Sequence, residues 1–139
     1  MVAQYTKPLP APDLETARFW EGCREHKLLA QKCSSCGAFR WPPRDLCPEC
    51  RSWDYAWVPL AGTAKVCSFV VVHHVTVPAF ADEAPYAVAR VTLDGTGDKV
   101  QMTTNIIDCP WEQVRVGMPV TVVFEDVTPE ATLPKFRPA

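Results

Sequence analysis

The sequence CSSC at residues 33–36, followed ten residues later by CPEC at 47–50, decides how the first half of this chain folds. Four thiolates in two CxxC pairs can place their sulfur atoms at the corners of a tetrahedron around one metal ion. Zn²⁺ favours this arrangement because its filled d shell imposes no other geometry. Gly37 follows the first pair, where a left-handed turn is least strained for a residue without a Cβ atom, whereas Arg51 follows the second. The spacing predicts a structural zinc site formed by Cys33, Cys36, Cys47 and Cys50.

Other uses of these cysteines remain open from the residues alone. Four sulfur ligands close the coordination sphere, so a metal here has no position for water or substrate and is expected to be noncatalytic. CPEC is also typical of a rubredoxin knuckle, which leaves iron as a less favoured metal. A redox-active CxxC is a further alternative. Two disulfides fit poorly, because the polar, proline-rich residues 1–12 do not form a secretory leader.

The composition is that of an ordinary globular protein. Apolar residues make up 47% of the 139 residues, charged residues 22%, and the formal net charge is −2. The chain lacks the basic excess expected of a nucleic-acid-binding protein. It also lacks an apolar run long enough to span a membrane, and we expect a cytoplasmic location.

The aromatic residues of the first half suggest a surface for a partner. Pro12 and Asp13 predict the start of a helix that continues through Leu14 to Cys23 and carries two adjacent large aromatic side chains. Trp53, Tyr55 and Trp57 would share one face of a strand, most simply as a small aromatic core. Aromatic residues are nevertheless enriched at interfaces, and these exceed the needs of a small metal-stapled module. The candidate interface residues are Phe19, Trp20, Trp41, Trp53 and Trp57.

The second half of the chain is predicted to be β-structure. Glycine- and proline-containing segments separate runs rich in valine, threonine and aromatic residues. We expect strands at 63–75, 86–93, 100–107, 118–127 and 135–138, loops at 77–85, 94–98 and 128–133, and a helical turn within 108–116. So many consecutive strands are unfavourable with both sheet edges open, which favours a small closed barrel. The predicted fold is mainly β: an N-terminal helix and zinc ribbon in residues 1–60, then a five-stranded OB-fold barrel in 61–139, with a small sandwich as the alternative.

No residue is predicted to be catalytic. His73 and His74 are adjacent, so on a strand they point to opposite faces and at most one could enter a given pocket. No serine, aspartate or cysteine partner can be placed beside them from the sequence. Cys23, Cys67 and Cys109 are scattered and are expected to act as small hydrophobic residues.

Several short motifs in a fixed order resemble one known family over nearly the whole chain. They are FWEG (19–22), CSSCG (33–37), PPR (42–44), CPEC (47–50), Trp57, GT (62–63), PY (85–86), GMPV (117–120) and FRP (136–138). The chain resembles the rubredoxin-like zinc-ribbon plus OB-fold family, formerly a domain of unknown function. Its members look like noncatalytic companions of thiolase-superfamily enzymes, including lipid-transfer-type thiolases and aldolases that act on acyl-CoA or steroid side-chain CoA thioesters.

The resemblance implies an accessory subunit in a hetero-oligomer. The helix and ribbon would contact the enzyme, and the barrel would lie near the CoA or acyl channel. Arg51, where the family commonly has glycine, and the polar turn at 94–98 depart from the family pattern. The alternative function is single-stranded nucleic-acid binding, which OB folds and zinc ribbons also perform.

Overall fold

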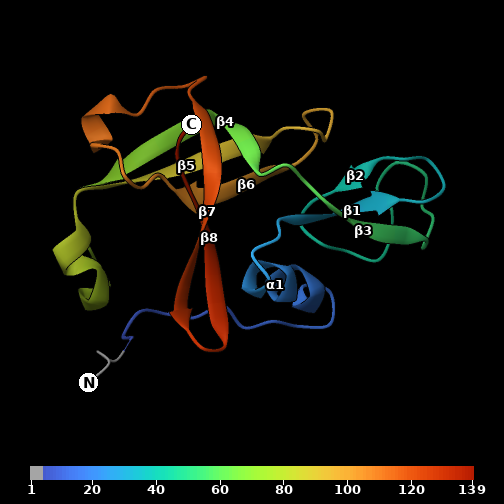
Figure 1. Cartoon of the computed structure of the whole chain (residues 1–139), viewed down its shortest axis with the longest axis horizontal. Helices are drawn as coiled ribbons and strands as arrows, with labels where there is room; N and C mark the ends of the chain where they lie inside the picture. Colours follow the sequence, from blue (N-terminus) through green and yellow to red (C-terminus); the bar gives the residue numbers. More distant parts are fainter. Residues whose placement is uncertain (1–4) are drawn as a thin grey trace.

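The computed structural model describes residues 5–139, which form a small three-stranded sheet, a helix and a five-stranded barrel (Figure 1). The elements are helix α1 (Ala17–Arg24) and strands β1 (Leu29–Cys33), β2 (Phe39–Arg40), β3 (Tyr55–Pro59), β4 (Thr63–Val72), β5 (Tyr86–Leu93), β6 (Gln101–Asn105), β7 (Pro119–Thr128) and β8 (Ala131–Pro138). Two short 3₁₀ helices span Pro78–Glu83 and Trp111–Gln113. The first lies within the segment expected to be a loop, and the second lies within the expected helical turn.

Helix α1 begins later than the sequence predicts. The Asp13 carboxylate accepts hydrogen bonds from the backbone N–H groups of Glu15 (3.1 Å) and Thr16 (2.8 Å), which holds the chain in a turn before the helix. Leu14 lies in this turn and is fully exposed, with a relative accessibility of 102%. The prediction that the helix includes Leu14 was therefore wrong.

The small sheet has the strand order β2-β1-β3 and forms the ribbon. Strand β2 was not among the predicted strands. Gly37, with φ of +78°, reverses the chain after the first cysteine pair, so that Phe39 and Arg40 pair with Lys32 and Gln31 of β1. The two rings of β3, Tyr55 and Trp57, pack edge to face with centroids 6.2 Å apart, whereas Trp53 precedes this strand.

The second sheet closes into a barrel. Its strand order is β6-β5-β4-β7-β8, and a parallel bridge between Ile106 and Phe136 joins its two ends. The backbone N–H of Ile107 donates to the carbonyl of Phe136 at 2.8 Å. This closure satisfies the edges that an open five-stranded sheet would expose. The OB-fold prediction is confirmed, and the sandwich alternative is not needed.

Strands β7 and β8 form a tight hairpin where a longer loop was expected at 128–133. The hydroxyl of Thr128 accepts hydrogen bonds from the N–H groups of Glu130 (3.3 Å) and Ala131 (3.0 Å), so the reversal is completed within Pro129 and Glu130. The expected loop was therefore too long, because the threonine turn was not recognised. Strand β4 ends at Val72, which leaves His73 and His74 just beyond it.

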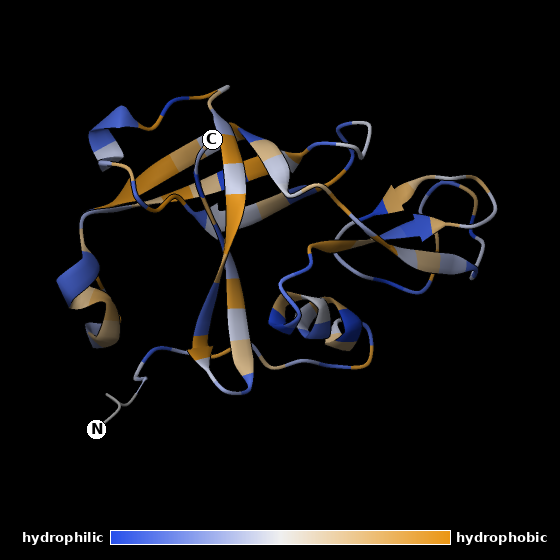
Figure 2. Cartoon of the chain, in the orientation of Figure 1, coloured by the Kyte–Doolittle hydropathy of each residue, from blue (hydrophilic) through white to orange (hydrophobic). Residues whose placement is uncertain are grey.

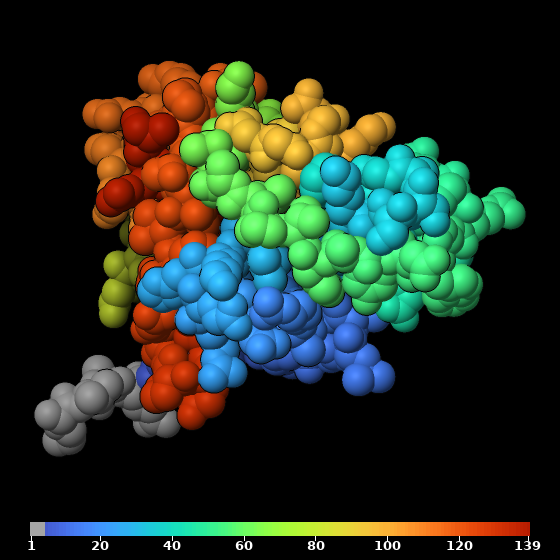
Figure 3. All heavy atoms as spheres, turned by 45° about the vertical axis from the view of Figure 1, so that its right-hand side comes forward, coloured from blue at the N-terminus to red at the C-terminus, as the bar shows by residue number. Residues whose placement is uncertain are grey.

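Helix α1 packs on the barrel as well as on the ribbon (Figure 3). Its buried residues Phe19 and Cys23 belong to the same core cluster as Val91, Val120 and Phe136 of the barrel. Apolar positions recur along the barrel strands, while the ribbon carries more polar segments (Figure 2). The domain boundary between residues 60 and 61 stays a prediction. In the part of the chain that the structure describes, no helix has the length and apolar character needed to cross a membrane.

Candidate metal centre

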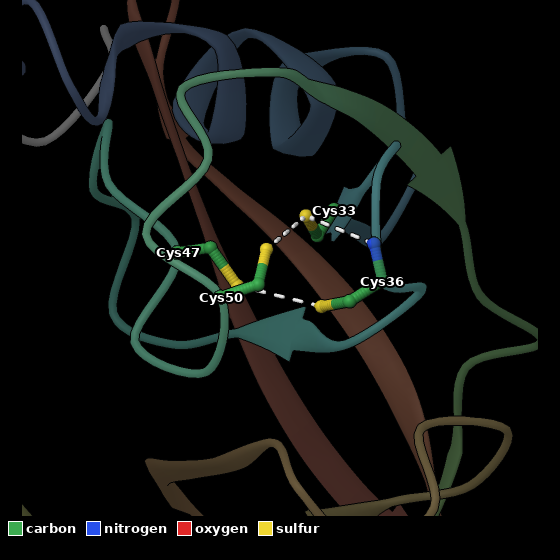
Figure 4. Close-up of side chains that lie close together, drawn as sticks. All are labelled: Cys33, Cys36, Cys47 and Cys50. Atoms are coloured by element: carbon green, nitrogen blue, oxygen red, sulfur yellow. Dashed lines mark hydrogen bonds between the residues drawn. The ribbon is translucent and has the colours of Figure 1, made fainter.

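The four cysteines of the two knuckles converge on one point in the ribbon (Figure 4). Cys33 ends β1 and Cys36 lies in the turn that follows, whereas Cys47 and Cys50 lie in the loop between β2 and β3. All four Sγ atoms are within 4.8 Å of one another. The Cys33–Cys50 and Cys36–Cys47 sulfur pairs are each 3.6 Å apart. A metal–sulfur distance of about 2.3 Å in a tetrahedron requires sulfurs about 3.8 Å apart. The thiols therefore fit a tetrahedral metal ion, and they form no disulfide.

The two knuckles share one backbone geometry. In each, the N–H of the residue after the second cysteine donates to the carbonyl of the first cysteine at 3.0 Å, from Gly37 to Cys33 and from Arg51 to Cys47. Both donors have positive φ, +78° for the glycine and +63° for the arginine. The left-handed conformation costs a non-glycine residue about 1–2 kcal/mol. Arg51 therefore preserves the turn at an energetic cost that a glycine would avoid.

The thiols differ in acidity before a metal binds. The backbone N–H of Cys36 is the main cause that lowers the pKa of Cys33, to about 6. The N–H of Cys50 acts in the same way and lowers the pKa of Cys47. For Cys36 the N–H of Ala38 lowers the pKa, but removal from water and hydrogen bonding to the other three thiols together raise it to about 12. In each knuckle the first cysteine therefore loses its proton more readily than the second, and metal binding must displace the protons that remain.

The candidate interface residues occupy three different environments. Trp53 is 69% exposed on the ribbon, and Leu46 beside the second knuckle is 40% exposed. Trp20, Trp41 and Trp57 are half-buried.

Phe19 lies inside the core at 4% exposure, with its ring 5.1 Å from that of Trp20 and 4.9 Å from that of Trp41. The Phe19 side chain is therefore not part of the protein surface. It packs against the rings of Trp20 and Trp41, which are partly exposed.

Two adjoining grooves run along the barrel, one of them beside α1. One, of about 310 Å³, lies between the half-buried Trp20 and Trp41 and the edge strand β6. The other, of about 370 Å³, lies between the N-terminal arm and the 3₁₀ helix Pro78–Glu83. Both are lined by Asn105, Leu133 and Lys135, so they form a continuous surface on the barrel. The arm is held there by an ion pair between Lys7 and Glu83.

The histidines that sequence reasoning weighed do not form a catalytic group. The ring of His73 packs edge-on against Trp111, with centroids 5.2 Å apart. Among residues 5–139, neither His73 nor His74 is within ion-pair distance of a carboxylate, whereas His26 is. That no residue is catalytic stays a prediction.

Sequence reasoning missed a polar cluster that joins the helix end to the barrel. Nε2 of His26 lies 3.0 Å from both carboxylate oxygens of Asp126, and its ring stacks on Phe124 at 5.4 Å. The hydroxyl of Thr132 donates to Asp126 at 2.6 Å. The Thr132 hydroxyl, followed by His26, lowers the pKa of Asp126. The contributing residues are too far apart in sequence for any local motif to reveal the cluster.

We expect Thr132→Val to reduce the stability at neutral pH by a small amount that disappears in acid. The substitution removes the donor that contributes most to lowering the pKa of Asp126. A carboxyl group with a lowered folded-state pKa stabilises the fold above its unfolded value, near 3.8, and loses this contribution as the pH falls through the folded value. Urea unfolding of the wild type and of Thr132→Val from pH 7 to 3 measures this difference in stability. A deficit that stayed constant in acid would assign the effect to packing instead.

Comparison with known proteins gives consistent matches to both parts of the chain. A family model described as "ChsH2, rubredoxin-like zinc ribbon domain" matches residues 20–55, and one described as "ChsH2, C-terminal OB-fold domain" matches residues 57–125. The DUF35 domain-containing scaffold protein of Methanocaldococcus jannaschii is 33% identical over 117 residues, which cover 83% of this chain and 80% of the relative.

Two further matches carry names of enzyme systems. The probable enoyl-CoA hydratase alpha subunit of Thermomonospora curvata is 40% identical over 134 residues, 96% of this chain. This chain spans only 40% of the length of that subunit. A solved structure described as "Ltp2-ChsH2(DUF35) aldolase" matches with a TM-score of 0.84 and 38% identity, covering 93% of this chain and 98% of the matched chain.

Proposed function

The chain belongs to the DUF35 family of ChsH2-type zinc-ribbon and OB-fold proteins, and on this basis we propose that it is a noncatalytic accessory subunit of a thiolase-superfamily enzyme. The observation that carries the proposal is the match to the ChsH2(DUF35) chain type of an Ltp2 aldolase, which this chain covers almost completely. The relative named a scaffold protein supports a binding role for the fold itself. The chain would form a hetero-oligomer with its enzyme.

The proposed substrates of that enzyme are acyl-CoA thioesters, including steroid side-chain CoA thioesters. The hydratase alpha subunit provides support through the CoA thioester in its name. The two adjoining grooves offer an elongated, largely apolar surface on the barrel, lined by aromatic side chains such as Phe80 and Trp41. We place this surface next to the acyl-CoA site of the partner, where it would help shape the channel.

A noncatalytic role agrees with the chemistry of the ribbon. A metal bound by four cysteines has a closed coordination sphere, so it stabilises the fold and does not activate substrate. We propose that Zn²⁺ is this ion, because it accepts tetrahedral thiolate coordination without a competing geometric preference. The thiols must stay reduced to bind it, which supports a cytoplasmic location.

Coexpression with a thiolase-superfamily enzyme from the same genome tests the assignment. We expect the two chains to elute together in size-exclusion chromatography, and CoA-thioester turnover to require both. The purified chain alone should show no turnover. A chain that stays monomeric beside every such enzyme, or that turns over an acyl-CoA by itself, would contradict the proposal.

Trp53→Ala tests the proposed interface within that complex. We expect the affinity for the partner to fall about tenfold or more, because buried tryptophans dominate interface energies. The stability of the free chain should change little, since the side chain is 69% exposed. Val116→Ala is the matched control, because Val116 is similarly exposed at 67% but precedes β7 on the barrel. Titration calorimetry gives both affinities, and equal losses in the two variants would remove Trp53 from the interface.

A further inference from the structure

Arg40 is a buried cation of the ribbon that forms no ion pair with a carboxylate of the described residues. Its side chain is 1% exposed on β2. A buried charge without compensation is strongly unfavourable, so the guanidinium must be satisfied in another way.

Backbone carbonyls on both sides of the second knuckle surround this guanidinium. Nη1 donates to the carbonyls of Arg44 (3.1 Å) and Asp45 (2.9 Å), which precede the knuckle. Nη2 donates to those of Ser52 and Asp54, both at 3.3 Å, which follow it. The group also lies over the Tyr55 ring, 4.8 Å from its centroid. The planar guanidinium of Arg40 therefore joins the segment before the second knuckle to the segment after it, and Cys47 and Cys50 lie between these two segments.

The same carbonyls connect Arg40 to the backbone of both knuckles. The Ser52 carbonyl also accepts the N–H of Cys47 at 2.9 Å, and the Asp54 carbonyl accepts the N–H of Ser34 at 3.0 Å. Ser34 follows the metal-ligand candidate Cys33. Arg40 and the backbone of each cysteine pair therefore donate hydrogen bonds to a common carbonyl group.

Gln31 reinforces this arrangement from the neighbouring strand. It pairs with Arg40 in the β1–β2 register and is also 1% exposed. Its Oε1 accepts the N–H of Arg44 at 2.8 Å, which fixes one of the peptide units whose carbonyl the arginine holds. Nε2 of Gln31 and Nε of Arg40 have no hydrogen-bond partner among the described residues.

The charge of a loaded metal site complements that of Arg40. Four thiolates and one divalent ion carry a net charge of −2, which a nearby buried cation stabilises in a medium of low dielectric constant. We propose that Arg40 is the positioning residue of the metal centre: it holds both knuckles at the spacing the ion needs, balances part of the charge, and fixes the backbone on either side of Trp53. The proposal concerns the ribbon alone and does not depend on a partner enzyme.

The test compares metal release from the full-length chain and two Arg40 variants. Zinc-loaded protein is mixed with excess chromogenic chelator, and the release rate is followed. We expect Arg40→Met to release zinc about 10- to 100-fold faster, the range typical for losing a group that orients metal ligands. Arg40→Lys should also release zinc faster, because an ammonium group cannot hydrogen-bond to the carbonyls on both sides of the second knuckle as the planar guanidinium does. Arg90→Met, which removes an exposed arginine from β5 of the barrel, is the control and should match wild type.

A second readout follows the backbone around Trp53. With 5-fluorotryptophan labelling and saturating zinc, the ¹⁹F resonance of Trp53, assigned with Trp53→Phe, should shift or broaden in both Arg40 variants and not in Arg90→Met. If Arg40→Met fails to fold, Arg40→Lys decides alone. Wild-type release and an unchanged Trp53 resonance in Arg40→Lys would overturn the proposal, because charge without the planar guanidinium would then suffice.

Discussion

Cys47→Ser is expected to lose its metal and unfold the ribbon while the barrel stays folded. Cys47 is completely buried at the centre of the thiol cluster, and a serine hydroxyl does not replace a thiolate ligand. Structural zinc contributes about 10–16 kcal/mol in zinc-finger peptides, far more than the small three-stranded sheet can gain from its few buried side chains. Most of the buried core cluster lies in the barrel, including Val91, Val120 and Phe136, so the barrel should persist.

Metal analysis and amide hydrogen exchange measure this result. We expect less than about a tenth of the wild-type zinc content, loss of protection in β1 and β3, and loss of partner binding. Cys36→Ser should behave in the same way. Cys67→Ser is the control, because Cys67 is exposed on β4 away from the cluster and should bind zinc normally. A zinc-free Cys47→Ser chain that still assembled with its enzyme would show that the metal does not organise the interface.

Phe19→Ala is expected to reduce the free energy of unfolding by about 3–5 kcal/mol, the usual cost of removing a buried phenylalanine ring. The side chain is 4% exposed and lies against both Trp20 and Trp41. Since domains of this size have total stabilities of about 5–15 kcal/mol, the loss is a large fraction of the whole. The helix would lose its main contact with the ribbon loop that carries Trp41.

Urea unfolding of the zinc-loaded protein measures this loss. Leu14→Ala is the control, because Leu14 is an apolar residue of the same segment that is fully exposed, and its effect should stay within about 0.5 kcal/mol. Partner binding should weaken only if the substitution displaces Trp20 and Trp41, because Phe19 itself is not expected to contact the partner. A change below about 1 kcal/mol in Phe19→Ala would mean that the ring is not a core residue, and that it is free to contact a partner directly.

The amino-acid sequence by itself determined the candidate metal site and most of the segments that form the barrel strands. The ligands of a knuckle are three residues apart, so chain connectivity alone brings them together, and the spacing of Cys33, Cys36, Cys47 and Cys50 is readable without a fold. The barrel strands were predicted for a related reason, because runs of valine, threonine and aromatic residues between glycine- and proline-containing segments are a local property of the chain. Errors at their ends, such as the over-long loop before β8, came from turn-forming hydroxyl groups that the pattern of apolar residues does not record.

Only the tertiary structure decided which aromatic residues are surface and which are core. Phe19, Trp20 and Trp53 are similar in the sequence, yet barrel packing buries the first and leaves the last exposed. The carbonyl cage of Arg40 and the pairing of His26 with Asp126 were likewise unpredictable. The physical reason is that these contacts join backbone groups and side chains that are distant in sequence. Their distances are set by the closure of the barrel and the folding of the ribbon around its metal site, which no local pattern encodes.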